Sequence, residues 1–127
     1  MGMRLIVVMV ASAFALSACG GSGGPARTPL IVDTDLSSDD AIALLYLAQE
    51  PRIDLRAVTV SGTGLVRCPT GGRIALDLLA LAGRPDVPVA CGAELPLAGF
   101  NSVPEDWRDA ADNLFGLTLP RAERQAR

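Results

Sequence analysis

The stretch LIVDTDLSSDDA at residues 30–41 combines a β-branched run, an acidic turn and the start of a helix. The apolar run at residues 30–32 is typical of a buried strand. Ser37 and Asp40 have the spacing of a capping box, which marks a helix start. An apolar stretch follows, and Pro51 ends it. These residues predict a strand that turns directly into a helix.

The same alternation repeats along the chain, with strands expected at residues 55–60 and 87–90 and a helix at 70–82. Strands that alternate with helices predict right-handed crossovers and an open, mainly parallel, Rossmann-like α/β sheet with flanking helices. Ligands bind such sheets at the carboxyl ends of the strands. The connections expected to converge there are residues 33–40, 61–64 and 91–95.

The C-terminal part predicts a packing helix over residues 105–114, with Trp107, Ala110, Ala111 and Leu114 on one stripe. Asp112 and Asn113 either line the mouth of a pocket or form a solvated helix end. Three parallel strands leave an exposed apolar edge. We therefore expect residues 30–127 to be the truncated N-terminal part of a larger domain, its edge covered by missing chain or by a second copy in a homo-oligomer.

Residues 1–18 contain one cation and an apolar run, which is typical of a secretory signal. An A-x-A site at residues 13–15 would give plain secretion. The sequence LSAC at residues 16–19 resembles a bacterial lipobox, with Cys19 acylated, and we favour this interpretation. It predicts a lipid-anchored, extracytoplasmic protein at the cell membrane, tethered by a Gly-rich linker at residues 19–29.

Composition excludes several classes of function. The 127 residues are 50% hydrophobic, enough for one domain with a core. No histidine is present, which excludes Ser-His-Asp and Cys-His mechanisms within this stretch. A net charge of −3 with 4% aromatic residues argues against a nucleic-acid partner. Cys68 and Cys91 follow consecutive strands, and a disulfide and two unpaired cysteines remain equal alternatives.

Four carboxylates, Asp33, Asp35, Asp39 and Asp40, lie within eight residues at a strand end and a helix start. The helix dipole explains one or two acids there, but not four. Crowded carboxylates repel one another unless a cation intervenes. The cluster therefore predicts a site for a hard divalent cation, and calcium is a suitable one because it accepts carboxylate, carbonyl and water ligands.

Two metal motifs compare poorly with this cluster. An EF-hand loop starting at Asp33 would need Gly and Glu where the chain has Ser38 and Leu44. The D-x-D-x-[TV] pattern of haloacid dehalogenase-like phosphatases matches residues 33–37 in part. It gives no role to Asp39 and Asp40, and its supporting lysine cannot come from this lysine-free stretch.

Residues 30–41 resemble the N-terminal signature of inosine–uridine-type nucleoside hydrolases, commonly D-x-D-P-G-x-D-D-A. Residues 57–63, 78–84 and 87–93 are similar to the family's following strand, helix and strand, and the resemblance covers residues 29–98. It implies calcium-dependent hydrolysis of the N-glycosidic bond of ribonucleosides, giving base and ribose. The alternatives are a non-catalytic calcium- or sugar-binding lipoprotein and the phosphatase.

The resemblance also implies a role for each acid. Asp35 would bind calcium and act as the general base that takes a proton from the attacking water. Asp40 would hold calcium through both carboxylate oxygens. Asp39 would bind a ribose hydroxyl, and Asp33 would brace the cluster by hydrogen bonds.

The sequence departs from the family at three points. Leu36-Ser37 replaces the usual Pro-Gly, which predicts a turn of different shape. Thr63 stands in place of Asn and is either a substrate-binding residue or a turn residue. The remaining calcium ligands, and the histidine that purine-type members use on the leaving base, would come from later segments of the family domain.

Overall fold

The computed structural model describes residues 26–100 and 103–126. The predicted signal peptide, Cys19 and most of the predicted linker lie outside these residues. Strands and helices alternate as expected, and a short 3-10 turn, η1, follows the last helix. The elements are β1 (Thr28–Thr34), α1 (Ser38–Gln49), β2 (Ile53–Val60), α2 (Cys68–Leu81), β3 (Val89–Cys91), α3 (Glu105–Asp112) and η1 (Leu114–Gly116).

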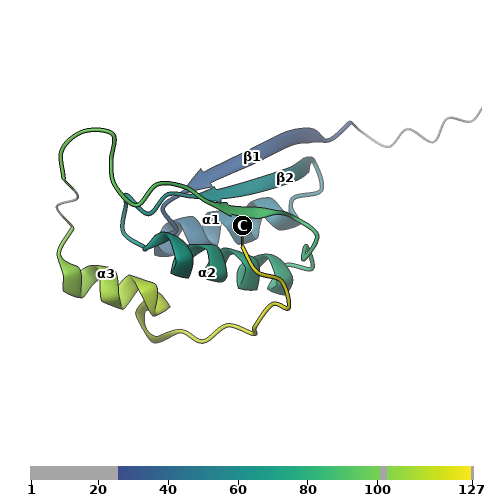
Figure 1. Cartoon of the computed structure of the whole chain (residues 1–127). Helices are drawn as coiled ribbons and strands as arrows, with labels where there is room; N and C mark the ends of the chain where they lie inside the picture. Colours follow the sequence, from purple (N-terminus) through teal and green to yellow (C-terminus); the bar gives the residue numbers. More distant parts are fainter. Residues whose placement is uncertain (1–25, 101–102, 127) are drawn as a thin grey trace, which may run out of the picture.

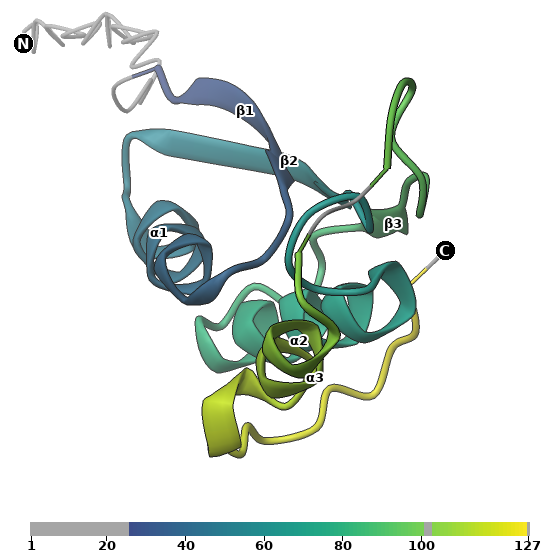
Figure 2. The same ribbon diagram turned by 90° about the vertical axis from the view of Figure 1, so that its left-hand side faces the viewer.

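The sheet is parallel throughout, in the order β1-β2-β3, which confirms the predicted fold class. Successive right-handed crossovers that advance in one direction place their helices on the same side of the sheet. Figures 1 and 2 accordingly show α1 and α2 under one face of the sheet. The carboxyl ends of all three strands therefore lie along one edge.

The strands β1 and β2 are longer than the apolar runs that predict them. Their pairing begins at Thr28 and Ile53 and continues to Thr34 and Val60. The register shifts once, so that Arg56 is an extra residue on β2. A bulge of this kind keeps the apolar side chains on the core face although their sequence alternation is interrupted.

The core fills the space between the sheet and the two helices that cover it. Val58 and Val60 of β2 are fully buried, as is Leu79 of α2, and Leu44 of α1 is nearly so. On the outward side, Ile31 of β1 remains 64% exposed. Among the described residues β1 is an edge strand, as predicted, and it also carries this exposed apolar side chain on its outward face.

The prediction for the buried face of the C-terminal helix is confirmed for Ala111, which lies in the core, and for Leu114, which packs against it, but it is wrong for Trp107. Helix α3 ends at Asp112, and its buried residues are Arg108 and Ala111. Trp107, expected to pack, is 65% exposed. The charged contacts of Arg108 decide the orientation, and apolar spacing alone does not reveal them.

A buried carboxylate joins α2 to the segment after η1. Asp77 is 5% exposed and accepts hydrogen bonds from Arg73 Nη2 and from the Ala122 backbone, each at 2.7 Å.

The longest described helix is α2, with 14 residues. Within residues 26–100 and 103–126, no helix combines the length and the apolar character needed to cross a membrane.

Candidate active site

Three connections meet at the carboxyl edge of the sheet, as predicted. The Ser61 amide donates to the Thr34 carbonyl at 2.9 Å, which joins the loop after β2 to the end of β1. The Gly62 amide donates to the Ala93 carbonyl at 3.0 Å, which joins the same loop to the one after β3. Because backbone atoms make these bonds, the loops hold one another in place whatever their side chains do.

Asp35 is the half-buried carboxylate around which this edge is organised. Its Oδ2 accepts a hydrogen bond from the Leu65 amide at 3.1 Å, and its Oδ1 accepts one from the Ser37 amide at 3.3 Å. Its backbone carbonyl accepts the Val66 amide at 3.3 Å. The loop of residues 61–67, named here the β2–α2 loop, thus fixes Asp35 from across the edge.

Gly64 of the β2–α2 loop lies directly against this carboxylate. A Cβ atom placed on Gly64 would lie 2.6 Å from Asp35 Cγ and closer still to Oδ2 and Cβ. Gly64 has no positive φ angle, so its backbone would accept alanine. The absence of a side chain at this position is what admits the Asp35 carboxylate.

Asp40 is held by the residue that ends β1. The hydroxyl of buried Thr34 donates to Asp40 Oδ2 at 2.5 Å and accepts from the Leu36 amide at 2.8 Å. The helix start at Ser37 is as predicted, but the capping box does not form. Ser37 makes no side-chain cap bond and donates its hydroxyl to Asp39 instead, because Asp40 is already engaged by Thr34.

The other two aspartates are exposed and accept hydrogen bonds from side chains of their own. Asp39 is exposed in the first turn of α1, and the hydroxyl of Ser37 that donates to it lowers the pKa of its carboxyl below the ordinary value. Asp33 is also exposed and accepts the Thr59 hydroxyl of β2 at 2.5 Å. The bond that the structure gives Asp33 therefore braces it against the neighbouring strand.

The turn between β1 and α1 has the different shape that the sequence predicts. Leu36 has φ 57° and is 1% exposed. A proline ring fixes φ near −65°, so the family's proline could not adopt this conformation. The left-handed backbone costs on the order of 1 kcal/mol, and burial of the leucine side chain offsets it by roughly 1.5–3 kcal/mol.

The sequence left two alternatives each for Thr63 and for the pair of Cys68 and Cys91, and these residues lie in or near the β2–α2 loop. Thr63 is half-buried, and its hydroxyl is 2.6 Å from that of Ser61. Cys68 and Cys91 form a disulfide in the structure, with Cα atoms 5.6 Å apart, joining the start of α2 to the end of β3. Glu94 Oε1 accepts the Cys68 amide at 2.9 Å, so a carboxylate also caps α2.

The donor chemistry of this edge suits a hard divalent cation, because every candidate ligand is a carboxylate oxygen. Among the described residues, however, no three Asp, Glu or Cys side chains gather closely enough to hold a metal. Asp35 and Asp40, each fixed by the hydrogen bonds above, therefore fit as part of a coordination shell that needs further oxygen ligands.

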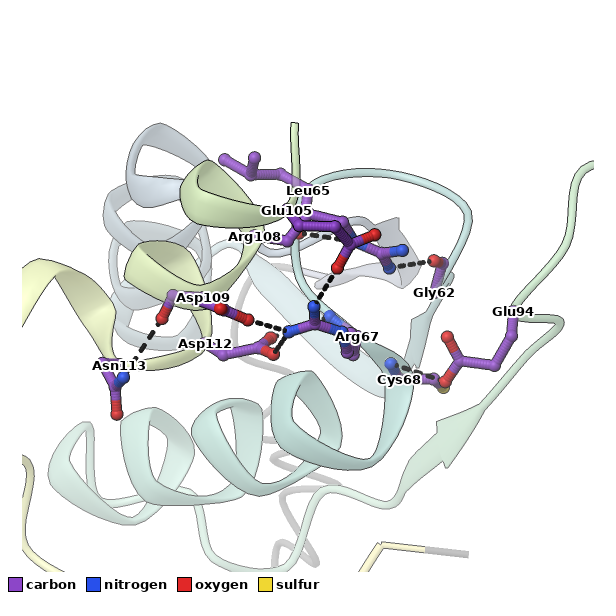
Figure 3. A network of polar contacts seen from close by, with 10 residues as sticks. All are labelled: Gly62, Leu65, Arg67, Cys68, Glu94, Glu105, Arg108, Asp109, Asp112 and Asn113. Atoms are coloured by element: carbon purple, nitrogen blue, oxygen red, sulfur yellow. Dashed lines mark hydrogen bonds and ion pairs between the residues drawn. The ribbon is translucent and has the colours of Figure 1, made fainter. Parts of the chain in front are cut away.

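Sequence reasoning missed two arginines that hold the β2–α2 loop, Arg67 and Arg108 (Figure 3). Arg67 pairs with three acids of α3, and Arg108 of α3 binds loop carbonyls. The sequence does indicate that α3 has a face suited to a cation, since acids at residues 105, 109 and 112 share one helix face. Nothing in the sequence indicated which arginine they face.

Known proteins resemble this chain in sequence and in structure. Residues 30–124 match the model of the inosine-uridine preferring nucleoside hydrolase family. A pyrimidine-specific ribonucleoside hydrolase of Photobacterium profundum, RihA, is 44% identical over 90 residues, which cover 71% of this chain and 26% of that protein. Uridine nucleosidase 1 of Arabidopsis thaliana is 36% identical over 96 residues, which cover 76% of this chain and 28% of the relative.

The comparison with solved structures agrees with the sequence matches. A plant nucleoside hydrolase, the PpNRh1 enzyme, superimposes with a TM-score of 0.66 at 34% identity, over 79% of this chain and 31% of the plant enzyme. The chain thus spans about a quarter to a third of the length of these relatives. With the family model covering most of the chain and Asp35 held at the carboxyl edge of the sheet, the chain belongs to the inosine-uridine preferring nucleoside hydrolase family.

Proposed function

We propose that this chain is the N-terminal part of a calcium-dependent hydrolase that cleaves the N-glycosidic bond of ribonucleosides. The observation that carries the proposal is the placement of Asp35. Its carboxylate lies at the carboxyl edge of a parallel sheet and is held there by amides from two separate segments. Membership of the nucleoside hydrolase family supports the reaction class.

In the proposed reaction, Asp35 is the general base. It takes a proton from water as the water oxygen bonds to the anomeric carbon and the bond from that carbon to the base nitrogen breaks. The departing nucleobase takes a proton from solvent, Asp35 returns its own proton to solvent, and the products are ribose and the free nucleobase. Positive charge develops on the sugar ring in the transition state, and nearby carboxylates stabilise it.

Asp40 and Asp35 would hold the calcium ion, with the remaining ligands supplied from outside the described residues. Bound calcium lowers the pKa of water and binds sugar hydroxyls. The Thr34 hydroxyl orients Asp40 for this role, since it occupies one side of Oδ2. Asp39, exposed beside this pair, would bind a ribose hydroxyl, Asp33 would support β1, and Thr63 would donate its hydroxyl to the sugar.

Pyrimidine ribonucleosides are the substrate class that we propose. Two relatives are named for pyrimidine ribonucleosides or for uridine. The haloacid dehalogenase-like phosphatase alternative loses its support, because residues 30–124 match the nucleoside hydrolase family model.

The proposal predicts that the full-length protein releases uracil and ribose from uridine. The test separates products by chromatography with uridine, inosine or 4-nitrophenyl phosphate as substrate. We expect turnover of uridine that chelation abolishes and that added calcium restores, and none of the phosphate ester. Calcium binding without turnover of either nucleoside would identify the non-catalytic binding protein instead.

For location, we propose a lipid-anchored, extracytoplasmic protein at the cell membrane, with plain secretion as the alternative. The lipobox-like sequence at residues 16–19 supports acylation of Cys19. Cells fed radioactive palmitate should label the wild-type protein, and C19S should remove the label. An unlabelled wild-type protein in the culture medium would contradict the anchor.

A further inference from the structure

Arg108 is a buried cation that the proposed reaction leaves without a role. It is 9% exposed, and its Nη2 donates to the Gly62 carbonyl at 2.8 Å. Its Nε donates to the Leu65 carbonyl at 3.3 Å. One planar guanidinium therefore binds the β2–α2 loop at two carbonyls, those of Gly62 and Leu65 (Figure 3).

The β2–α2 loop also contacts α3 through Arg67, the last residue of the loop. Arg67 Nη1 contacts Asp112 and Asp109, the latter at 2.9 Å, and Nη2 contacts Glu105 at 2.5 Å. These carboxylates, Asp112 first, raise the pKa of Arg67. Asp112 Oδ1 also accepts the Arg67 amide at 2.9 Å. Asp112 is thus a loop anchor and not a solvated helix end, and together with Asn113 it also lines a cavity between α2 and the segment after α3.

Helix α3 has few apolar attachments of its own. It has eight residues, and among them only Arg108 and Ala111 are buried. The charged contacts are therefore what fastens α3 to the β2–α2 loop. Exposed ion pairs such as that of Glu105 contribute little, whereas buried Arg108 would leave two carbonyls unpaired if it were removed.

The same loop holds Asp35. The Leu65 residue whose carbonyl accepts Arg108 donates its own amide to Asp35 Oδ2 at 3.1 Å. A displacement of the loop at Leu65 would carry this amide away from the carboxylate. Arg108 thus lies two hydrogen bonds from the proposed general base, on an element more than 70 residues further along the chain.

We propose that Arg108 is a positioning residue: it clamps the β2–α2 loop onto α3 and thereby fixes the Asp35 carboxylate for proton abstraction. Its effect on hydrolysis rests on the proposed function, but its effect on the loop does not. Arginine suits the task because its rigid fork reaches two carbonyls at once, which the single ammonium of lysine cannot do.

The test compares R108M and R108K with R56M in the full-length protein. Arg56 is a matched control, since its side chain is 65% exposed and its ion pair with Asp54 lies on the β2 bulge. We expect R108M to lower kcat for uridine about 10- to 100-fold with little change in KM, as outer-shell substitutions do. R108K should recover part of this loss, and R56M should match wild type.

Hydrogen exchange at the Leu65 and Val66 amides is the readout that does not depend on activity. Both should exchange at least about tenfold faster in R108M than in wild type, because local opening of the loop becomes easier. If R108M does not fold, R108K carries the comparison, with exchange and kcat expected between wild type and complete loss.

Wild-type exchange and wild-type kcat in the arginine variants would overturn the clamp. A loss of kcat with unchanged exchange at Leu65 and Val66 would overturn it as well. An inactive wild-type protein would refute the proposed function alone, because faster exchange in R108M would still establish the clamp.

Discussion

Replacing Asp35 with alanine in the full-length protein should lower kcat for uridine hydrolysis about a thousandfold, the typical contribution of a general base. The expected loss is in kcat because the carboxylate acts on the water proton in the transition state. D35N keeps the shape of the side chain and one acceptor oxygen, but its amide cannot take the proton. It should therefore be nearly as inactive as D35A.

The matched control is D86A, which removes an aspartate whose side chain is 71% exposed and whose partner is Arg84. D86A should keep wild-type kinetics. Circular dichroism should show that D35A retains its secondary structure. Full activity in folded D35A would remove Asp35 from the mechanism, and activity in D35N close to wild type would show that the proton goes elsewhere.

Adding one methyl group at Gly64 should also lower activity strongly, although less than removing the Asp35 carboxylate does. The new Cβ would lie 2.6 Å from Asp35 Cγ and closer to its Cβ, so turning the carboxylate alone cannot relieve the overlap. Either β1 or the β2–α2 loop must shift. We expect G64A to lower kcat about 100-fold, because a misplacement near 1 Å has effects of this size.

The overlap should also lower the free energy of unfolding by about 1–3 kcal/mol, as overpacking does. The control is G72A on α2, where the closest atoms to a new Cβ are Ala126 Cβ at 2.9 Å and Cys91 Sγ at 3.7 Å. The segment around Ala126 can yield without moving Asp35, so G72A should stay active. Wild-type kinetics in G64A would show that this contact does not position Asp35.

Local pattern was enough to predict the elements of this fold. The β-branched run before Asp33 and the helix ended by Pro51 follow from near-neighbour chemistry. Parallel topology follows from their alternation, and the shared edge of the loops follows from that topology. The bulge at Arg56 and the extension of β1 to Thr28 were not predictable, because they arise from pairing between strands.

The site was predictable in composition but not in its contacts. The acids were found as a cluster in sequence, yet Asp33 and Asp39 have partners of their own and Asp40 bonds Thr34 instead of capping the helix. The Leu65 amide that fixes Asp35 comes from a residue 30 positions away. Such a bond has no local signature, since any residue supplies the same backbone amide.

Helix α3 shows how charge can override apolar spacing. The predicted packing face is confirmed at Ala111 and Leu114, but Arg108 is buried on α3 while Trp107 remains exposed. The β2–α2 loop presents backbone carbonyls and an arginine to this helix, so a cation and three acids satisfy the contact better than an indole ring. The partner of the helix, not the helix itself, determines its orientation.

In the proposed function, Asp35 and Asp40 help to hold a calcium ion, and Asp35 is also the general base. Equilibrium dialysis of the metal-stripped, full-length protein against radioactive calcium measures this directly. We expect saturable binding of a single ion per chain, weakened at least about tenfold in D40N and unchanged in D86N. No calcium retained by the folded wild-type protein, or equal affinity in D40N, would contradict it.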